Sequence, residues 1–294
     1  MIVDPEWNVL AHLAGKPMRD ETWDPGCAEA AQKMNSVRDR VVLSPEERNH
    51  RRGQFAALRA GISYGGGQTH PQNLDLGENE GVIRELLADP NIQRIVGFAN
   101  STFATGAPKL YKHYESNINA LVEHDPTLEM PFSNSIHAAV TFNLGPRTVT
   151  KKHVDSGNLP NGWCAITPLG NFDASAGGHF VLHEFKLIIQ FPANSTIHVP
   201  SGSVTHSNLP VQRHETRLSL TQYTAGPLHR WVAYGFRTEK MLARQDPAEK
   251  AQMDAARAGR WPAALRLFSK YEELEADIRR EFGLPNPTSD MHAL

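Results

Sequence analysis

The chain contains 294 residues, of which 40% are hydrophobic, and it carries a formal charge of −2 at pH 7 with a pI near 6.7. This composition suits a folded protein with a sizeable core, and it disfavours bulk electrostatic partners such as bare nucleic acid or an anionic membrane, while leaving room for local basic patches. Apolar runs stay far short of the roughly 20 residues that a membrane span requires, and no secretory signal is readable. The two cysteines, Cys27 and Cys164, provide no disulfide framework. We therefore expect an intracellular protein, nuclear or cytoplasmic.

The first 130 residues are expected to be mostly helical. Residues 25–59 read as helices, because 28–40 is rich in alanine and Ser44-Pro45 supplies a cap followed by a proline at the first helical position. Three glycines at 65–67 then interrupt the pattern. Apolar positions at helical spacing predict further helices over 80–88, 92–105 and 108–123.

After Pro131 the sequence changes to short segments rich in Val, Ile, Thr, Phe and Trp, separated by Gly, Pro and Asn. This texture predicts β-strands, and many short strands at close spacing indicate a sandwich or barrel. The predicted strands are 136–144, 163–169, 179–182, 186–191, 195–199 and 216–224. Helices return after about residue 238, and 262–282 has an apolar stripe and a charged face, so we expect it to pack on the outside of the barrel.

A candidate metal site begins at His153-Val154-Asp155, just after a predicted strand. In extended chain, residues two apart point to the same side, so His153 and Asp155 can converge on one ion. Farther along, His206 follows a turn and offers a third ligand. Two imidazoles and one carboxylate on one face of a metal leave its other positions open, which suits non-haem Fe(II).

Other histidines compete for the same role. His198 and His214 are alternative third ligands, although their spacing to Arg217 fits less well. His113-Tyr-Glu115 has the same form as the candidate motif, but it lies in a predicted helix, where residues two apart diverge by about 200°. We interpret that pair as solvated surface.

Arg217 lies on a predicted strand with polar side chains on one face, namely Arg217, Ser219, Thr221 and Tyr223. Leu218 and Leu220 take the other face. A buried guanidinium needs an anionic partner, and its planar fork suits a carboxylate. The distal carboxylate of 2-oxoglutarate is the expected partner, with Ser219 adding a hydrogen bond. Fe(II), 2-oxoglutarate and O2 are thus the expected cofactor and cosubstrates. The alternative is an ordinary surface ion pair between Arg217 and Glu215 or Glu184.

These motifs resemble the ten-eleven-translocation and J-binding-protein (TET/JBP) branch of the 2-oxoglutarate oxygenases, over residues 135–236, and most of all its compact fungal members. The shared pattern is His-x-Asp-x-x-Asn, a distal His, and Arg-x-Ser with a Tyr on the same strand. In this chain the pattern falls on His153, Asp155, Asn158, His206, Arg217, Ser219 and Tyr223.

The predicted fold class is accordingly α+β, with a double-stranded β-helix (jelly-roll, cupin-like) barrel over 131–237. A mostly helical region over 1–130 and helices over 238–294 would extend this core, and residues 1–294 would form a single catalytic domain. The alternative is that the helical N-terminal region is a separate unit.

The resemblance also implies a substrate, namely duplex DNA with a methylated base. Asn158 would hydrogen-bond a flipped base and Tyr223 would stack on it. Ala225 departs from the animal enzymes, which have a second base-contacting histidine there, so both 5-methylcytosine and N6-methyladenine stay open, with 5-methylcytosine preferred.

DNA phosphates would need cationic partners, and four candidates are Arg51, Arg52, Lys151 and Lys152. No sequence motif indicates a membrane or a protein partner. Two alternative functions use the same barrel: hydroxylation of a small molecule or protein residue, and a catalytically inert binding module.

Overall fold

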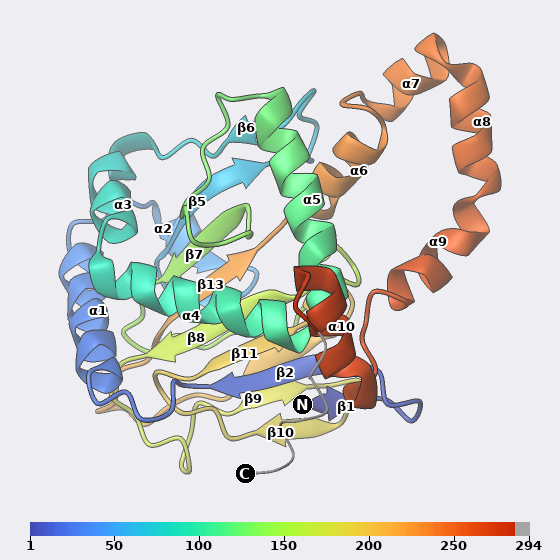
Figure 1. Ribbon diagram of the computed structural model, residues 1–294. Coiled ribbons are helices and arrows are strands. Elements are labelled where there is room, and N and C mark those ends of the chain that lie inside the picture. The colour runs from blue at the N-terminus through green and yellow to red at the C-terminus, as the bar shows by residue number, and fades with distance from the viewer. Residues whose placement is uncertain (286–294) are drawn as a thin grey trace.

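The computed structural model describes residues 1–285, which form a large antiparallel sheet, a small sheet and surrounding helices (Figure 1). The large sheet has the strand order β1-β2-β11-β8-β13-β7-β5-β6, and the small sheet has the order β10-β9-β12. The large-sheet strands are β1 (Ile2–Val3), β2 (Val9–Gly15), β5 (Ala57–Ser63), β6 (Gln72–Asn73), β7 (Ala139–Asn143), β8 (Cys164–Leu169), β11 (Thr196–Val199) and β13 (Leu218–Tyr223). The small-sheet strands are β9 (Phe180–Leu182), β10 (Leu187–Ile189) and β12 (His206–Asn208).

From β7 onward the chain passes back and forth between these two sheets. β7, β8, β11 and β13 lie in the large sheet, and the segments between them supply the small sheet. An isolated antiparallel bridge between His153 and His206 adds the segment after β7 to the edge of the small sheet. Apolar side chains from both sheets, such as Ile166 and Phe180, share one buried cluster. Two packed antiparallel sheets connected in this way form a double-stranded β-helix. The predicted α+β fold class is confirmed, and all the strands predicted between 136 and 224 are present, slightly shorter than expected.

The N-terminal region contributes strands as well as helices, which corrects the prediction that it is mostly helical. β5 pairs with β7, and β2 pairs with β11, so both belong to the large sheet. Residues 25–59 were predicted as helices, but after α1 (Trp23–Arg38) only the short α2 (Pro45–Arg48) is helical. A hairpin of β3 (Asn49–His50) and β4 (Gly53–Gln54) follows, and then β5. The physical reason is that β5 buries alternate residues against the barrel, a period of two that a helix cannot provide.

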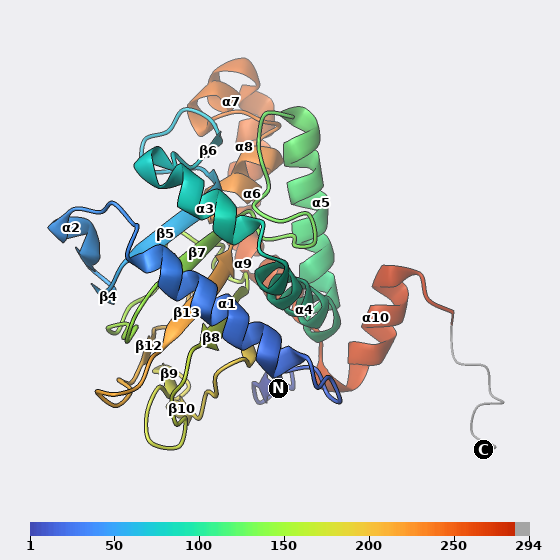
Figure 2. The same ribbon diagram turned by 90° about the vertical axis from the view of Figure 1, so that its left-hand side faces the viewer.

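Helices cover the outer face of the large sheet (Figures 1 and 2). They are α1, α3 (Glu80–Leu87) and α4 (Pro90–Gly106), whose buried residues share a core with Leu218 and Leu220 of β13. α4 begins where Asp89 accepts hydrogen bonds from the backbone of Asn91 and Ile92, an N-cap followed by proline. α5 (Pro108–His124) follows directly, and a 3-10 turn, η1 (Gly77–Asn79), precedes α3. The helices predicted over 80–88, 92–105 and 108–123 are confirmed.

The C-terminal helices differ from the single helix predicted over 262–282. They are α6 (Gly226–Ala233), α7 (Glu239–Gln245), α8 (Pro247–Ala255), α9 (Arg257–Leu265), the 3-10 turn η2 (Tyr271–Glu273) and α10 (Leu274–Phe282). α10 packs on the body, where Asp277 pairs with Lys109 of α5 at 3.2 Å. α7, α8 and α9, here called the helical arm, curve away from the barrel (Figure 1), and α8 and α9 have no buried residue. None of the helices within 1–285 is long and apolar enough to span a membrane.

Candidate metal centre

His153, Asp155 and His206 are brought together by the bridge that closes the small sheet. The backbone N–H of His153 donates to His206 O at 3.0 Å, and that of His206 donates to His153 O at 2.9 Å. Asp155 follows two residues after His153, and its N–H donates to Ser201 O at 2.9 Å. One ligand atom from each of the three side chains lies within 4.8 Å of the other two. The pair His153 and Asp155 therefore converges as extended chain predicts.

Hydrogen bonds orient both imidazoles for metal binding. Nδ1 of His153 lies 2.6 Å from Lys151 O, and Nδ1 of His206 lies 2.9 Å from Val204 O. Because a carbonyl can only accept, each Nδ1 is the donor, which leaves Nε2 as the atom of each ring that can bind a metal. The Nε2 atoms lie 3.6 Å and 3.7 Å from the two carboxylate oxygens of Asp155. Burial, followed by the neighbouring His206, lowers the pKa of His153 to about 4. The ring is therefore neutral at pH 7, the form that binds a metal.

This donor set fits the expected metal. Two imidazoles and one carboxylate form the facial arrangement of non-haem Fe(II), with open positions for further ligands. No other group of three metal-binding side chains occurs within residues 1–285. The two rival third ligands lie elsewhere: His198 is buried beside Thr102, with 2.9 Å between Nε2 and the Thr102 hydroxyl, and His214 is exposed.

Arg217 lies in the same cavity as the triad and has no acidic partner within residues 1–285. Its side chain is only 2% exposed, its Nε has no hydrogen-bond partner, and its Nη1 donates to Thr148 O at 3.3 Å. Burial lowers the pKa of Arg217 to about 10, so the guanidinium remains charged at pH 7. The alternative ion pairs do not form, since Glu215 accepts from backbone N–H groups of Asp173 and Gln212, and Glu184 accepts from Thr205. A buried, unpaired cation is costly, which marks this as a site for an anion.

Polar side chains that the sequence analysis missed line the same cavity. Asn143 donates from Nδ2 to the Ser219 hydroxyl at 2.9 Å, while its own Oδ1 has no partner within the described residues. The Ser219 hydroxyl accepts this bond, so its proton is still available to donate to a ligand. The signal was present: Thr141 and Asn143 are polar at alternate positions of an otherwise apolar strand, the period of one sheet face.

The triad cavity is small, with a volume of about 40 Å³. It is lined by Arg52, Phe55, Asn143, Thr150, His153, Asp155, Ile166, Phe180, His206, Asn208, Arg217, Ser219 and Thr221. Arg52, which lines this cavity, is half-buried and has no side-chain hydrogen bond within residues 1–285.

The predicted cationic residues lie around the metal centre. Arg51 and Arg52 form the two-residue turn of the β3–β4 hairpin, which places Nη2 of Arg51 3.8 Å from Asp155 Oδ1. Lys151 and Lys152 are exposed on the segment that leads into His153, and the Lys151 N–H donates to Arg52 O at 2.7 Å. Their contacts with DNA stay predictions.

Neither of the two residues predicted to contact a base is among the residues that line the triad cavity. Asn158 donates from Nδ2 to the Ser201 hydroxyl at 2.9 Å and lines a separate cavity against α6 and α9. Tyr223, the last residue of β13, is half-buried against the apolar cluster shared by the two sheets. Neither base contact is tested by this geometry.

One other prediction concerns a site away from the metal. His113 was interpreted as solvated surface, but it is half-buried and its ring stacks on His229 with 5.1 Å between centroids.

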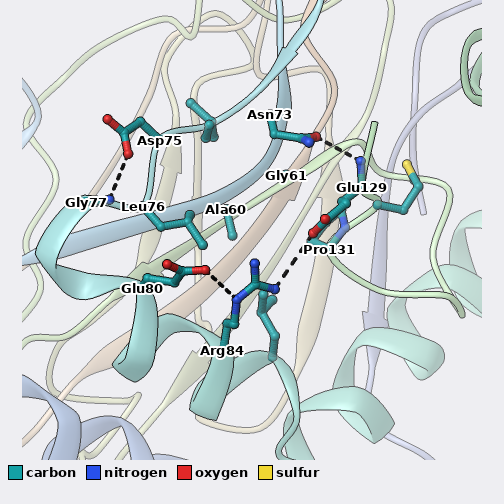
Figure 3. Close-up of a pocket in the computed structure, with 13 residues that line it drawn as sticks. Ala60, Gly61, Asn73, Asp75, Leu76, Gly77, Glu80, Arg84, Glu129 and Pro131 are labelled. Carbon is teal, nitrogen blue, oxygen red and sulfur yellow. Dashed lines mark hydrogen bonds and ion pairs between the residues drawn. The ribbon is translucent and has the colours of Figure 1, made fainter. Parts of the chain in front are cut away.

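A cavity of about 420 Å³ lies at the β5–β6 edge of the large sheet (Figure 3). There Arg84 pairs with Glu80 at 2.8 Å and with Glu129 at 3.7 Å. That guanidinium is already neutralised, so the cavity shares none of the features of the Arg217 site.

No protein-family model and no curated protein sequence matches the chain. Among solved structures, NgTET1 in complex with 5mC DNA is similar over 68% of this chain and 67% of that one, with a TM-score of 0.47 and 16% identity. A 2OG-Fe(II) oxygenase family oxidoreductase from Burkholderia pseudomallei covers 66% and 77%, with a TM-score of 0.36 and 17% identity. A Pseudomonas putida prolyl-4-hydroxylase covers 74% and 92%, with a TM-score of 0.35 and 16% identity. With identities and TM-scores this low, the function of this chain has to be argued from the residues of its own site.

Proposed function

We propose that this protein is an Fe(II)- and 2-oxoglutarate-dependent dioxygenase that hydroxylates a methylated base in DNA. The observation that carries the enzyme class is the charged, buried and unpaired Arg217 in the same cavity as a two-histidine, one-carboxylate triad. A metal site alone fits many functions. A metal site that faces an unsatisfied guanidinium fits a cosubstrate with an anionic end.

The residues have distinct roles in this proposal. His153, Asp155 and His206 would hold the iron and leave positions open for 2-oxoglutarate and O2. Arg217 would bind the distal carboxylate of 2-oxoglutarate, and Ser219 would donate a further hydrogen bond to it. Ile166 and Phe180, which line the cavity, would exclude water from the reacting atoms. When bound, iron and 2-oxoglutarate supply the oxidation of a C–H bond by O2, with release of succinate and CO2.

For the substrate we propose 5-methylcytosine in duplex DNA, with N6-methyladenine as the second candidate. The motif pattern with Asn158 and Tyr223 supports a base, and Arg51, Arg52, Lys151 and Lys152 near the triad support phosphate contacts. Such a base has to be flipped out of the duplex before its methyl group can reach the iron. Hydroxylation would give 5-hydroxymethylcytosine, with further oxidation to follow, or an N6-hydroxymethyl group that decays to adenine and formaldehyde. A nuclear or cytoplasmic location would be compatible with this substrate.

The test is an aerobic incubation with Fe(II), ascorbate and 2-oxoglutarate on duplexes that contain 5-methylcytosine or N6-methyladenine. Nucleoside mass spectrometry reports the base, and succinate reports cosubstrate turnover. Oxidised or demethylated base, absent with Asp155→Ala, is the expected result. Succinate formed while both bases stay intact would contradict the DNA assignment and favour a small-molecule substrate. A protein that retains no iron and forms no succinate would contradict the oxygenase.

A further inference from the structure

A second large cavity lies between the helical arm and the body. Its volume is about 740 Å³, within the range of roughly 300–1,000 Å³ that is usual for ligand sites. α5 and α6 line one side, α8 and α9 line the other, and the segment of residues 156–161 lines the base. That segment begins directly after Asp155, so this arm cavity opens beside the metal centre.

Three arginines give the arm cavity a positive charge, namely Arg230, Arg257 and Arg260. None of them forms an ion pair with any residue in 1–285, and no Asp or Glu lines the cavity. Asp254, on α8, pairs with Lys250 at 2.5 Å, and Lys250, followed by Arg260 and Arg257, lowers the pKa of Asp254. Arg260 also donates from Nη2 to Met253 O at 2.7 Å. Three guanidinium groups without an ion pair of their own around one cavity still favour an anionic ligand.

The remaining lining is apolar and aromatic. Trp261 of α9 is 50% exposed, and Leu159, Tyr234 and Met253 lie around the same cavity. The side chain of a tryptophan that is half open to solvent is available for stacking on a planar ring. The ligand should therefore combine an anionic group with an aromatic ring.

A buried histidine supplies unused hydrogen-bonding capacity at the same place. His229 of α6 is 5% exposed and lines the cavity, and both its ring nitrogens lack a partner within the described residues. Its ring stacks on His113 of α5, which lines the cavity as well. A buried polar group without a partner is costly, and a ligand would satisfy it.

We propose that the arm cavity binds one nucleotide of a nucleic acid strand, next to the nucleotide that enters the metal centre. The phosphate would lie against Arg257 and Arg260, and the base would stack on Trp261. Phosphates recognised by arginine and bases stacked on aromatic side chains are the two general means of holding a strand without reading its sequence. This inference rests on the proposed function, because it assigns the strand that carries the target base, and it gives the otherwise unpacked helical arm a binding role.

The test compares two double variants with equal loss of charge. Arg257→Gln/Arg260→Gln removes two of the three cations from the cavity, whereas Lys240→Gln/Arg244→Gln removes two from α7, outside it. Fluorescence anisotropy of a labelled methylated duplex is measured across a series of salt concentrations. Loss of the one phosphate contact that the two arginines share should reduce the magnitude of the slope of log K against log salt by about 0.9. The α7 control should bind like the wild type.

Trp261→Ala tests the stacking contact separately. The affinity should fall roughly ten-fold, with the salt slope unchanged, since stacking on one base is worth about 1–3 kcal/mol. All substituted side chains are exposed, so circular dichroism should report an intact fold. Cavity variants that bind as tightly as the α7 control would overturn the inference. Full competition by a free deoxynucleotide would also overturn it, by assigning the cavity to a free ligand.

Base oxidation measured in the same samples separates the two proposals. Arm-dependent binding without base oxidation would retain the arm cavity and overturn the proposed function. Base oxidation together with binding that does not depend on the arm residues would retain the proposed function and overturn the arm-cavity inference.

Discussion

At the scale of single residues, Arg217 carries the most information. It is a charged group in a place where desolvation is costly, and the surrounding protein offers it one backbone carbonyl and no carboxylate within residues 1–285. The Cζ atom of Arg217 lies 5.9 Å from the centroid of the Phe172 ring. This cation–π contact favours the guanidinium but does not neutralise its charge. A protein keeps such a residue when a ligand supplies the missing anion, and stability is sacrificed for that ligand.

Arg217→Met should therefore separate stability from activity. We expect its free energy of unfolding to equal or exceed that of the wild type, by up to about 1–4 kcal/mol, because an unpaired buried charge is replaced by an apolar chain. Half-maximal succinate formation should require a 2-oxoglutarate concentration roughly ten-fold or more above that of the wild type, since charged hydrogen bonds contribute about 1.5–3 kcal/mol. Urea denaturation and cosubstrate titration measure the two effects. An Arg217→Met protein that is markedly less stable and turns over normally would show that the arginine is structural.

Asp155→Ala should abolish iron retention and turnover. Loss of an outer partner of a metal ligand already costs about 10–100-fold, and loss of the charged ligand itself should cost more. Iron content by atomic absorption and succinate yield are the measurements. Ser203→Ala serves as the control, because Ser203 lies on the same turn that leads to His206 without lining the cavity. Equal iron content in Asp155→Ala and Ser203→Ala would refute the metal assignment.

At the scale of elements, β5 shows how a segment outside the barrel is fitted to it. Gly61 pairs with Ala139 at a φ of +109°, and a Cβ there would lie 2.2 Å from Ala138 O. Only glycine allows this close approach of the two strands. The hairpin that carries Arg51 and Arg52 lies just before β5 in the chain, so the packing of β5 also helps to position the cationic turn.

Gly61→Ala should lower the free energy of unfolding by roughly 1–3 kcal/mol for the strained backbone position, and by more in total because the new Cβ would clash with Ala138 O. Gly66→Ala is the matched control, since Gly66 also has a positive φ but has open space around its Cα. Its effect should be smaller by the cost of the clash. Urea denaturation of both variants gives the comparison, and equal losses would mean that the close contact with β7 is unimportant.

At the scale of the whole molecule, the interior holds histidines that are neutral in the folded state. His137 is buried against Phe103 and Tyr114, and His229 packs on α5. Burial lowers the pKa of His137 to about 3, and burial, followed by His113, lowers the pKa of His229 to about 3. In the unfolded chain both would titrate near 6.5. Between pH 6.5 and 3 the unfolded state therefore binds more protons, so stability falls as the pH falls.

Acidification from pH 7 to 5 should consequently destabilise the protein. Each of these histidines contributes a loss of about 1.4 kcal/mol per pH unit below 6.5. His137→Gln, which cannot be protonated, should lose about 2 kcal/mol less than the wild type between pH 6.5 and 5. Urea denaturation in the presence of a chelator measures this without metal binding. Identical pH dependence in the two proteins would mean that His137 does not titrate between these states.

Local sequence was enough to locate the three residues of the candidate metal site, the polar face of β13, three of the helices and the strands between 136 and 224 other than β12, whose residues were placed after a turn. These features depend on residues two to four positions apart, and such spacings translate directly into side-chain direction. The strand identity of β2 and β5, the approach of Arg51 to Asp155 and the arm cavity were not foreseen. They depend on pairings between segments far apart in the chain, as between β5 and β7, and no local period encodes which distant strand supplies the partner. Burial decided the rest, because whether Arg217 has a carboxylate beside it is settled only when the two sheets close over it.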